Sequence, residues 1–129
     1  MQFKLIALLT LAVASVNGAA VFKRFSGTCD CAGTIYSNAA ISQAVQQSRG
    51  RTFGRRKYPH RFNNRENLSS SVAGCTAGTL EEFPILSGKL FNGSPDYPGP
   101  DRVIFSSSAA SCGCITHSGA SGNGFNLCT

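Results

Sequence analysis

Apolar positions recur at helical spacing in one segment of the chain, residues 39–49. The positions that fall on one face of a helix there are Ile41, Ala44, Val45 and Ser48. Ser37 or Asn38 can cap the start of this helix, and Gly50 can end it after Arg49. The pattern predicts a single helix that is about 16 Å long and too short to be stable alone in water. It therefore needs a sheet to cover.

Short segments with the composition of β-strands follow the helix, separated by clusters of Gly, Pro, Ser and Asn. They span Lys57–Phe62, Glu82–Leu86, Arg102–Phe105 and Cys112–Thr116. Strands that succeed one another without intervening helices favour an antiparallel sheet, so the pattern predicts an α+β fold with the helix packed on that sheet. Pro59 and Pro84 fall inside two of these strands, where a missing N–H must face an edge, a bulge or a bend.

The first residues have the pattern of a signal peptide rather than of a folded domain. Lys4 precedes an apolar run from Leu5 to Val16, and small residues follow to position 20. This run is too short to span a bilayer. Residues 21–24 end in the dibasic step Lys23-Arg24, which is typical of a processed pro-segment. We expect a secreted protein, not a membrane protein, with a single domain over residues 25–129.

Positive charge is concentrated in one stretch of this expected domain. The whole chain has 12 Lys and Arg against 6 Asp and Glu, and removal of residues 1–24 lowers the net charge to about +3. The basic residues between positions 49 and 61 are Arg49, Arg51, Arg55, Arg56, Lys57 and Arg61. They indicate either a local basic patch for a polyanion or simply a soluble loop.

All six cysteines lie in the part of the chain that would be exported, where disulfides are expected. The pairs Cys29-x-Cys31 and Cys112-x-Cys114 have one intervening residue, fewer than zinc ribbons use, so we expect no metal site. Spacing alone does not choose among the possible pairings.

The chain has two histidines, His60 and His117, which suggest acid/base chemistry or else are ordinary surface or core residues. In an alternating strand, His60 shares one face with Tyr58 and Phe62. If Glu82, Arg102 and His117 project to the same face, a carboxylate, a guanidinium, two imidazoles and a hydroxyl come together. Such a set suits phosphoryl chemistry.

The parts of several other hydrolases are missing from the sequence. We find no carboxylate cluster for two metal ions, no G-x-S-x-G elbow and no phosphate-binding loop followed by Lys-Ser or Lys-Thr. A phosphodiesterase without metal or other cofactor needs another source of nucleophile, and RNA supplies its own 2′-OH. The argument points to RNA rather than DNA, and Tyr58, Phe62 and Phe125 are consistent with stacked bases.

Five separated segments carry a family resemblance that covers nearly the whole chain after residue 24. They are Tyr58-Pro59-His60-Arg61-Phe62-Asn63-Asn64, Glu82-Phe83-Pro84-Ile85-Leu86, Gly99-Pro100-Asp101-Arg102-Val103-Ile104, Ile115-Thr116-His117-Ser118-Gly119-Ala120-Ser121-Gly122-Asn123-Gly124-Phe125, and the closing Cys128. In this order they resemble the secreted fungal ribonucleases of the T1/N1/U2 family. The resemblance implies one helix packed on an antiparallel sheet whose concave face bears the site.

The resemblance also implies catalytic roles. Glu82 would take the proton from the 2′-OH with His60 assisting it, and His117 would protonate the leaving 5′-oxygen. The residues that would stabilise the charged transition state are Tyr58, Arg102 and Phe125. The first product would be a 2′,3′-cyclic phosphate, which slower hydrolysis would convert to a 3′-phosphate.

Base recognition in the family uses the loop after the first site strand and an Asn near the C-terminus. The matching residues are Phe62, Asn63, Asn64, Arg65, Glu66 and Asn123. Guanine fits, because Glu66 can accept from its N1–H and exocyclic amine while backbone amides of residues 63–64 donate to O6 and N7. Arg65 stands where guanyl-specific members have a second tyrosine, so guanine and general purine preference both remain open.

For the cysteines, the resemblance implies the disulfides Cys31–Cys128 and Cys75–Cys112. Cys29 and Cys114 are left over, either bonded to each other or both free. Gly124 replaces a residue that is often Asn in the family, so a contact beside the phosphate is expected to be missing.

Our leading hypothesis is a monomeric, guanine-preferring endoribonuclease acting on single-stranded RNA. A secreted effector that keeps the fold but binds host RNA or protein is an alternative, although such a binder has no reason to keep Glu82, His60, His117 and Arg102 together. A ribotoxin-like enzyme is a third possibility, disfavoured because those relatives carry much longer basic loops.

Overall fold

The computed structural model describes residues 27–68, 75, 79–106 and 111–129. The expected signal peptide and pro-segment, residues 1–20 and 21–24, lie outside the described residues. In the described part of the chain, no helix has the length and apolar character needed to cross a membrane.

The helix α1 spans Asn38–Ser48, within one residue of the prediction at each end. Ser37 is its N-cap, because the backbone there is extended and the Ser37 hydroxyl accepts a hydrogen bond from the Ala40 amide at 3.1 Å. Its buried residues are those of the predicted apolar face, Ile41, Ala44, Val45 and Ser48. Gly50, just beyond the helix, has a φ of +67°, which favours glycine.

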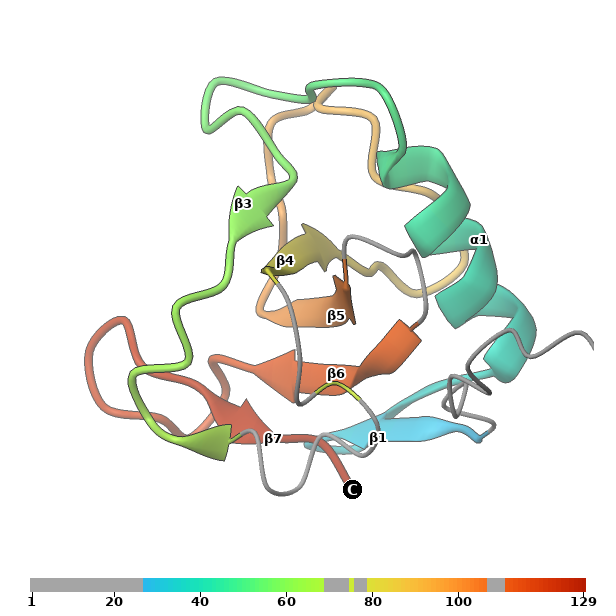
Figure 1. The fold of residues 1–129 in the computed structure, drawn as a ribbon. Coiled ribbons are helices and arrows are strands. Elements are labelled where there is room, and N and C mark those ends of the chain that lie inside the picture. The colour runs from blue at the N-terminus through green and yellow to red at the C-terminus, as the bar shows by residue number, and fades with distance from the viewer. Residues whose placement is uncertain (1–26, 69–74, 76–78, 107–110) are drawn as a thin grey trace, which may run out of the picture.

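Two antiparallel sheets follow from the pairing of the strands (Figure 1). The larger sheet has the order β3-β4-β5-β6-β7, and the smaller is the hairpin β1-β2. The strands are β1 (Cys29–Cys31), β2 (Thr34–Tyr36), β3 (His60–Arg61), β4 (Leu80–Pro84), β5 (Asp101–Ser106), β6 (Ser111–Thr116) and β7 (Asn126–Leu127). The predicted α+β class, one helix on an antiparallel sheet, is confirmed.

The strand boundaries differ from those predicted. The strand expected over Lys57–Phe62 is reduced to β3, because Lys57 has a φ of +55° and Tyr58 pairs instead with Phe53. The strand expected over Glu82–Leu86 is shifted to Leu80–Pro84. We did not predict β1, β2 or β7, which have at most three residues each and so show almost no alternation.

Pro84 closes β4 without disturbing the pairing with β5. The next residue, Ile85, donates its amide to the Asp101 carbonyl at 3.2 Å, so the N–H position of Pro84 faces the other side of the strand. On that side β3 pairs only as far as His60 with Glu82. The missing donor therefore faces a free edge, as expected for proline in a strand.

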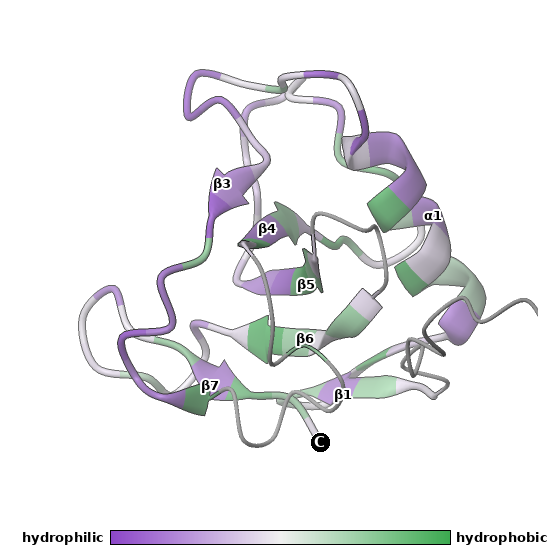
Figure 2. Cartoon of the chain, in the orientation of Figure 1, coloured by the Kyte–Doolittle hydropathy of each residue, from purple (hydrophilic) through white to green (hydrophobic). Residues whose placement is uncertain are grey.

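Apolar side chains fill both faces of the sheet. On the helix side, Ile41 and Val45 belong to one core cluster with Phe83, Val103 and Phe105. On the other side, the buried residues are Phe62, Cys75, Ile104, Cys112 and Ile115. Figure 2 shows this arrangement as hydrophobic colouring along β4, β5 and β6 and on the side of α1 turned towards them.

Three disulfides staple the fold. Cys31–Cys128 and Cys75–Cys112 are the pairings implied by the family resemblance, and Cys29 and Cys114 are bonded to each other. The Cys29–Cys114 bond joins β1 to β6, while Asp30 and Thr129 exchange both backbone hydrogen bonds. The two ends of the domain are thereby held side by side.

Candidate active site

The polar side chains singled out in the sequence gather on the sheet face opposite α1. Glu82 alternates with Phe83, which packs towards the helix, and Arg102 alternates with Val103 in the same way. His60 pairs directly with Glu82, and Pro84 pairs with Arg102. His117 follows the end of β6. Glu82 and Arg102 therefore project to one face, and His60 contacts Glu82 there. Tyr58 belongs to the core cluster on the helix side and reaches this group through its hydroxyl, which accepts from Arg102.

Glu82 is a nearly buried carboxylate. It is 8% exposed, and its Oε1 lies 3.3 Å from Nδ1 of His60. Its Oε2 is buried and has no hydrogen-bond partner among the described residues. Burial raises the pKa of the Glu82 carboxyl, and this effect outweighs the nearby charges of Arg102, His60 and His117, which lower it. A carboxylate with a raised pKa accepts protons more readily than an exposed one.

His60 connects this carboxylate to the chain that precedes it. The His60 ring stacks on Tyr58 with centroids 3.9 Å apart, and its Nε2 contacts the backbone carbonyl of Arg56. A carbonyl oxygen only accepts, so this contact requires a proton on Nε2. Nδ1 faces the carboxylate, 3.3 Å from Glu82 Oε1, so a proton bound there would be donated to Glu82.

The Arg102 side chain is almost completely buried, and hydrogen bonds fix the position of its guanidinium. It is 2% exposed, and its Nη1 donates to the carbonyls of Pro98, Gly99 and Asp101 at 3.2, 2.7 and 2.8 Å. Its Nη2 donates to the Tyr58 hydroxyl at 3.0 Å. The guanidinium carbon also lies 5.3 Å from the centre of the Tyr58 ring. The guanidinium is a fixed positive charge beside Glu82.

His117 is oriented by the loop that follows β6. Its Nδ1 lies 2.8 Å from the Gly124 carbonyl, so Nδ1 carries a proton. Its ring stacks on Phe125 at a centroid distance of 3.9 Å, and Phe125 in turn meets Phe62 edge to face. These contacts leave Nε2 as the ring nitrogen available for proton transfer.

A cavity of about 190 Å³ adjoins these groups. It is lined by all the residues predicted to recognise a base, together with two catalytic candidates and Arg61: Arg61, Phe62, Asn63, Asn64, Arg65, Glu66, Glu82, Asn123 and Phe125. Glu66 joins the two loops of the cavity, since its Oε1 accepts from the Phe125 amide at 3.3 Å. Asn64, with a φ of +49°, closes its own loop by accepting the Leu68 amide at 2.6 Å.

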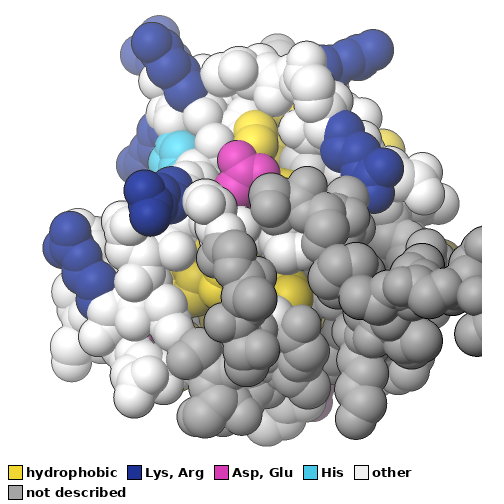
Figure 3. All heavy atoms as spheres, viewed as in Figure 1, with side chains coloured by type: hydrophobic (Ala, Val, Ile, Leu, Met, Phe, Trp, Pro, Cys, Tyr) yellow, Lys and Arg dark blue, Asp and Glu magenta, His cyan; other side chains and the backbone are white. Residues whose placement is uncertain are grey.

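The basic run between positions 49 and 61 is divided by the fold. Arg49 and Arg51 line a separate groove with Glu81, on the helix side of the sheet, while Arg61 borders the cavity described above. Figure 3 shows Lys and Arg side chains placed around one face, with an acidic and a histidine side chain between them. The predicted patch is therefore several basic positions with different neighbours.

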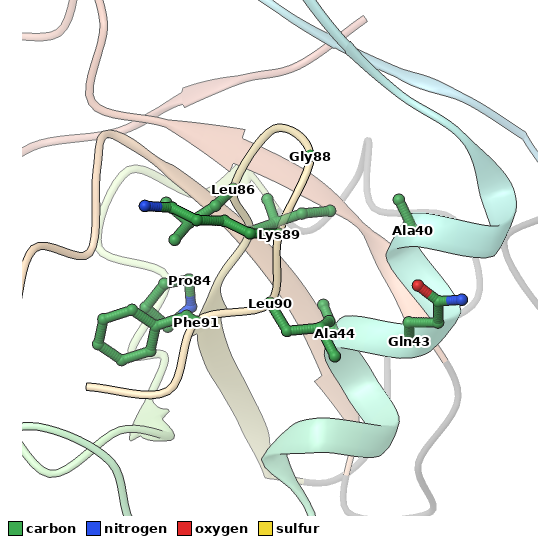
Figure 4. Close-up of a pocket in the computed structure, with 10 residues that line it drawn as sticks. Ala40, Gln43, Ala44, Pro84, Leu86, Gly88, Lys89, Leu90 and Phe91 are labelled. Carbon is green, nitrogen blue, oxygen red and sulfur yellow. The ribbon is translucent and has the colours of Figure 1, made fainter. Parts of the chain in front are cut away.

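Another cavity, of about 170 Å³, lies between α1 and the chain after β4 (Figure 4). The residues that line it are Ala40, Gln43, Ala44, Pro84, Ile85, Leu86, Gly88, Lys89, Leu90 and Phe91. Lys89 is the one titratable side chain among the residues that line this cavity. Within the described residues, no three His, Cys, Asp or Glu side chains come together as a metal site would require.

Sequence analysis missed the backbone groups that orient the site. The carbonyl of Arg56 holds His60, those of Pro98 and Gly99 hold Arg102, and that of Gly124 holds His117. Every residue carries a carbonyl group, so no residue type marks these positions.

Comparison with known proteins agrees with this geometry. The family model described as ribonuclease matches residues 24–129. The chain is 42% identical over 108 residues to guanyl-specific ribonuclease Ap1 of Aspergillus pallidus, covering 78% of this chain and 98% of that one. It is 40% identical over 130 residues to guanyl-specific ribonuclease F1 of Fusarium fujikuroi, covering 97% of this chain and 91% of that one. Among solved structures, the ribonuclease RNase He1 of Hericium erinaceus superposes with a TM-score of 0.60 at 32% identity, covering 80% of this chain and 99% of that one. The chain belongs to the ribonuclease family.

Proposed function

We propose that the protein is a secreted endoribonuclease that cleaves single-stranded RNA on the 3′ side of guanosine without a metal ion. The observation that carries this proposal is the pairing of Glu82 with His60 beside the fixed charge of Arg102, next to a cavity that Glu66 lines. Homologues named guanyl-specific ribonucleases support the base preference.

In the first step, Glu82 takes the proton of the 2′-OH, and the 2′-oxygen attacks the adjacent phosphorus. When its Nδ1 carries a proton, His60 donates to Glu82 across the 3.3 Å contact and so stabilises the carboxylate before the transfer. Arg102 and the Tyr58 hydroxyl, which are already hydrogen-bonded to each other, stabilise the negative charge that develops on the phosphate oxygens. Phe125 bounds the phosphate site from the side of the C-terminal loop.

His117 completes this step by giving its Nε2 proton to the 5′-oxygen as the P–O bond breaks. The charge of His117 is among those that lower the pKa of Glu82, which supports assigning both groups to one phosphate. The products are a 2′,3′-cyclic phosphate and a free 5′-OH. In the second step His117 activates water and Glu82 returns its proton to the 2′-oxygen, which leaves a 3′-phosphate.

Guanine is the base that the cavity suits. The Glu66 carboxylate has acceptor capacity beyond its bond to the Phe125 amide, and guanine offers N1–H and an exocyclic amine to it. Adenine has no proton on N1, so Glu66, which is exposed in the free protein, would face an acceptor once a bound base covered it. An unsatisfied group of this kind costs about 1–3 kcal/mol. Phe62 and Arg65 supply surfaces on which a base can stack.

The test is digestion of a defined single-stranded RNA in EDTA, with mapping of the new ends. We expect cuts after G that carry first a cyclic phosphate and then a 3′-phosphate, and no cutting of the DNA of the same sequence. Cuts after A and G alike would replace the guanine preference with a purine preference. Intact RNA would favour the non-catalytic effector.

The assigned base is tested by Glu82→Gln, which we expect to lower kcat about 100-fold or more, as for loss of a proton-transfer group. The matched control is Glu81→Gln, because Glu81 is the neighbouring carboxylate on the opposite face of the same strand. Near-full turnover of the Glu82→Gln protein would contradict its role.

A further inference from the structure

Basic side chains are concentrated at the tip of a small hairpin next to the active site. Phe53 and Tyr58 exchange two backbone hydrogen bonds of 2.9 Å, and the Lys57 amide donates to the Gly54 carbonyl at 3.2 Å. The consecutive residues Arg55, Arg56 and Lys57 are exposed on this closed turn. Three consecutive positive charges on an exposed turn form a local positive surface to which a polyanion is attracted.

The hairpin is fixed in position by the segment that precedes β5. Asp96 accepts the Arg55 amide at 3.0 Å, and Gly93 packs so closely that a Cβ there would lie 2.5 Å from the Gly54 nitrogen. Figure 1 shows the two segments meeting above β3, on the side from which the chain enters that strand. Asp96 contributes one negative charge against the three positive charges of the hairpin tip, so the surface remains positive.

Both segments also contact the catalytic groups directly. The carbonyl of Arg56 contacts Nε2 of His60, and the carbonyl of Pro98 accepts from Arg102 at 3.2 Å. Residues 55–57 and 96–98 therefore border the place where the scissile phosphate would lie. In the proposed reaction, however, the side chains of Arg55 and Lys57 have no part.

Tyr97 lies between Asp96 and Pro98, and 72% of its surface is exposed. The other exposed large apolar residues in the described part of the chain, Ile35 and Leu90, are aliphatic. An exposed aromatic ring beside a basic strip is the combination that single-stranded nucleic acid binds, with bases stacked on the ring and phosphates held by the cations.

We propose that Arg55, Lys57 and Tyr97 form an extended RNA-binding surface, here called the hairpin surface. It would hold a nucleotide beyond the two that flank the scissile bond, with its phosphates at Arg55 and Lys57 and its base on Tyr97. This inference rests on the proposed function, because it assumes that the RNA strand bound at the hairpin surface is the one that passes through the active site. It predicts a preference for oligonucleotides over dinucleotides.

Binding is tested first, without cleavage. The probe is a fluorescent single-stranded RNA of about twelve nucleotides. Its one guanine is carried by a 2′-deoxyguanosine, so the 2′-OH that would act as nucleophile is absent. We expect Arg55→Gln/Lys57→Gln to weaken binding about ten-fold and to make the slope of log affinity against log salt shallower by about 1.4, or about 0.7 for each lost phosphate contact. We expect Tyr97→Ala to weaken binding about ten-fold and Tyr97→Phe to preserve it.

The matched control is Arg51→Gln/Lys89→Gln, which removes the same charge from two exposed positions, one at the groove that Glu81 lines and one at the cavity beside α1. Equal weakening in both double variants, or none in either, would overturn the hairpin surface. So would a Tyr97→Ala protein that binds as the wild type does.

Cleavage then separates this inference from the proposed function. With an all-ribose version of the oligonucleotide, kcat/KM should fall about ten-fold in Arg55→Gln/Lys57→Gln, while kcat/KM for the dinucleoside guanylyl-uridine should be unchanged. Equal losses on both substrates would overturn the hairpin surface. A wild type that cleaves neither RNA but loses binding in the hairpin variants would refute the proposed reaction and support the surface.

Discussion

The burial of Glu82 suits its proposed role as a base but makes its ionised form unfavourable in the folded protein. Burial raises the pKa of its carboxyl, and the positive charges of Arg102 and His60 only partly offset this. In the proposed reaction a raised pKa makes Glu82 a stronger base, while it must still be ionised to accept the proton. The rising limb of activity with pH should therefore lie above the ordinary Glu value of 4.5.

The same shift predicts a gain in stability from Glu82→Gln. Because the pKa is higher in the folded than in the unfolded state, ionisation of Glu82 favours unfolding. The wild type keeps this part of its stability below the unfolded pKa and loses it as pH rises through the folded pKa. We therefore expect Glu82→Gln to increase the free energy of unfolding relative to the wild type, by more at pH 7 than at pH 4, as measured by urea denaturation.

Glu81→Gln serves as the control for removal of one carboxylate from β4. If Glu82→Gln raised the free energy of unfolding equally at both pH values, or if Glu81→Gln raised it by the same amount, the effect of burial on Glu82 would be contradicted.

One hydrogen bond joins two elements that are distant in the sequence. The Tyr36 hydroxyl at the end of β2 donates to Oδ2 of Asp101 at the start of β5, at 2.6 Å. Tyr36 is 5% and Asp101 2% exposed, and burial together with this carboxylate raises the pKa of the Tyr36 phenol. Because Arg102 follows Asp101, the bond anchors the strand that carries the guanidinium of the proposed site.

We expect Tyr36→Phe to lower the free energy of unfolding by about 1–3 kcal/mol, because it leaves a buried carboxylate oxygen without its donor. The measurement is urea unfolding at neutral pH. Tyr97→Phe makes the same chemical change at an exposed position and should change stability little. Equal effects of the two substitutions would show that the Tyr36–Asp101 bond contributes nothing.

The disulfides determine how the whole molecule is closed. Cys31–Cys128 spans 97 residues of sequence, Cys29–Cys114 spans 85 and Cys75–Cys112 spans 37. Two of the bonds tie the N-terminal hairpin to β6 and to the C-terminus. A domain of this size buries a limited core, so such cross-links supply much of its stability.

Removing the longest cross-link should destabilise the protein most. We expect Cys31→Ala/Cys128→Ala to lower the free energy of unfolding by about 2–5 kcal/mol in the chain-entropy description. The Cys75–Cys112 bond closes a shorter loop, so Cys75→Ala/Cys112→Ala should lower the free energy of unfolding by about 1 kcal/mol less. Thermal or urea unfolding of the two variants measures the order, and a larger loss in the Cys75 and Cys112 variant would contradict it.

Local patterns predicted the parts of the fold that depend on local interactions. The period of Ile41, Ala44 and Val45, with Ser37 before them, located α1 to within one residue. The strands β5 and β6 were also predicted closely, since they are buried and apolar. The boundaries of β3 and β4 were not, because the turn at Lys57 and the pairing of β4 with β5 decide where those strands begin and end.

The residue types of the proposed site were determined by the sequence alone: one carboxylate, two imidazoles and one guanidinium. Strand alternation directs Glu82 and Arg102 to one face, whereas His117 follows the end of β6. Only the tertiary structure decided how they act on one another. Pairing across β3, β4 and β5 places His60 against Glu82, and burial there, which no local pattern encodes, raises the Glu82 pKa. The tertiary structure also decided the bond between Cys29 and Cys114, because a disulfide requires its two cysteines to be close in space, and these two lie on strands far apart in the chain.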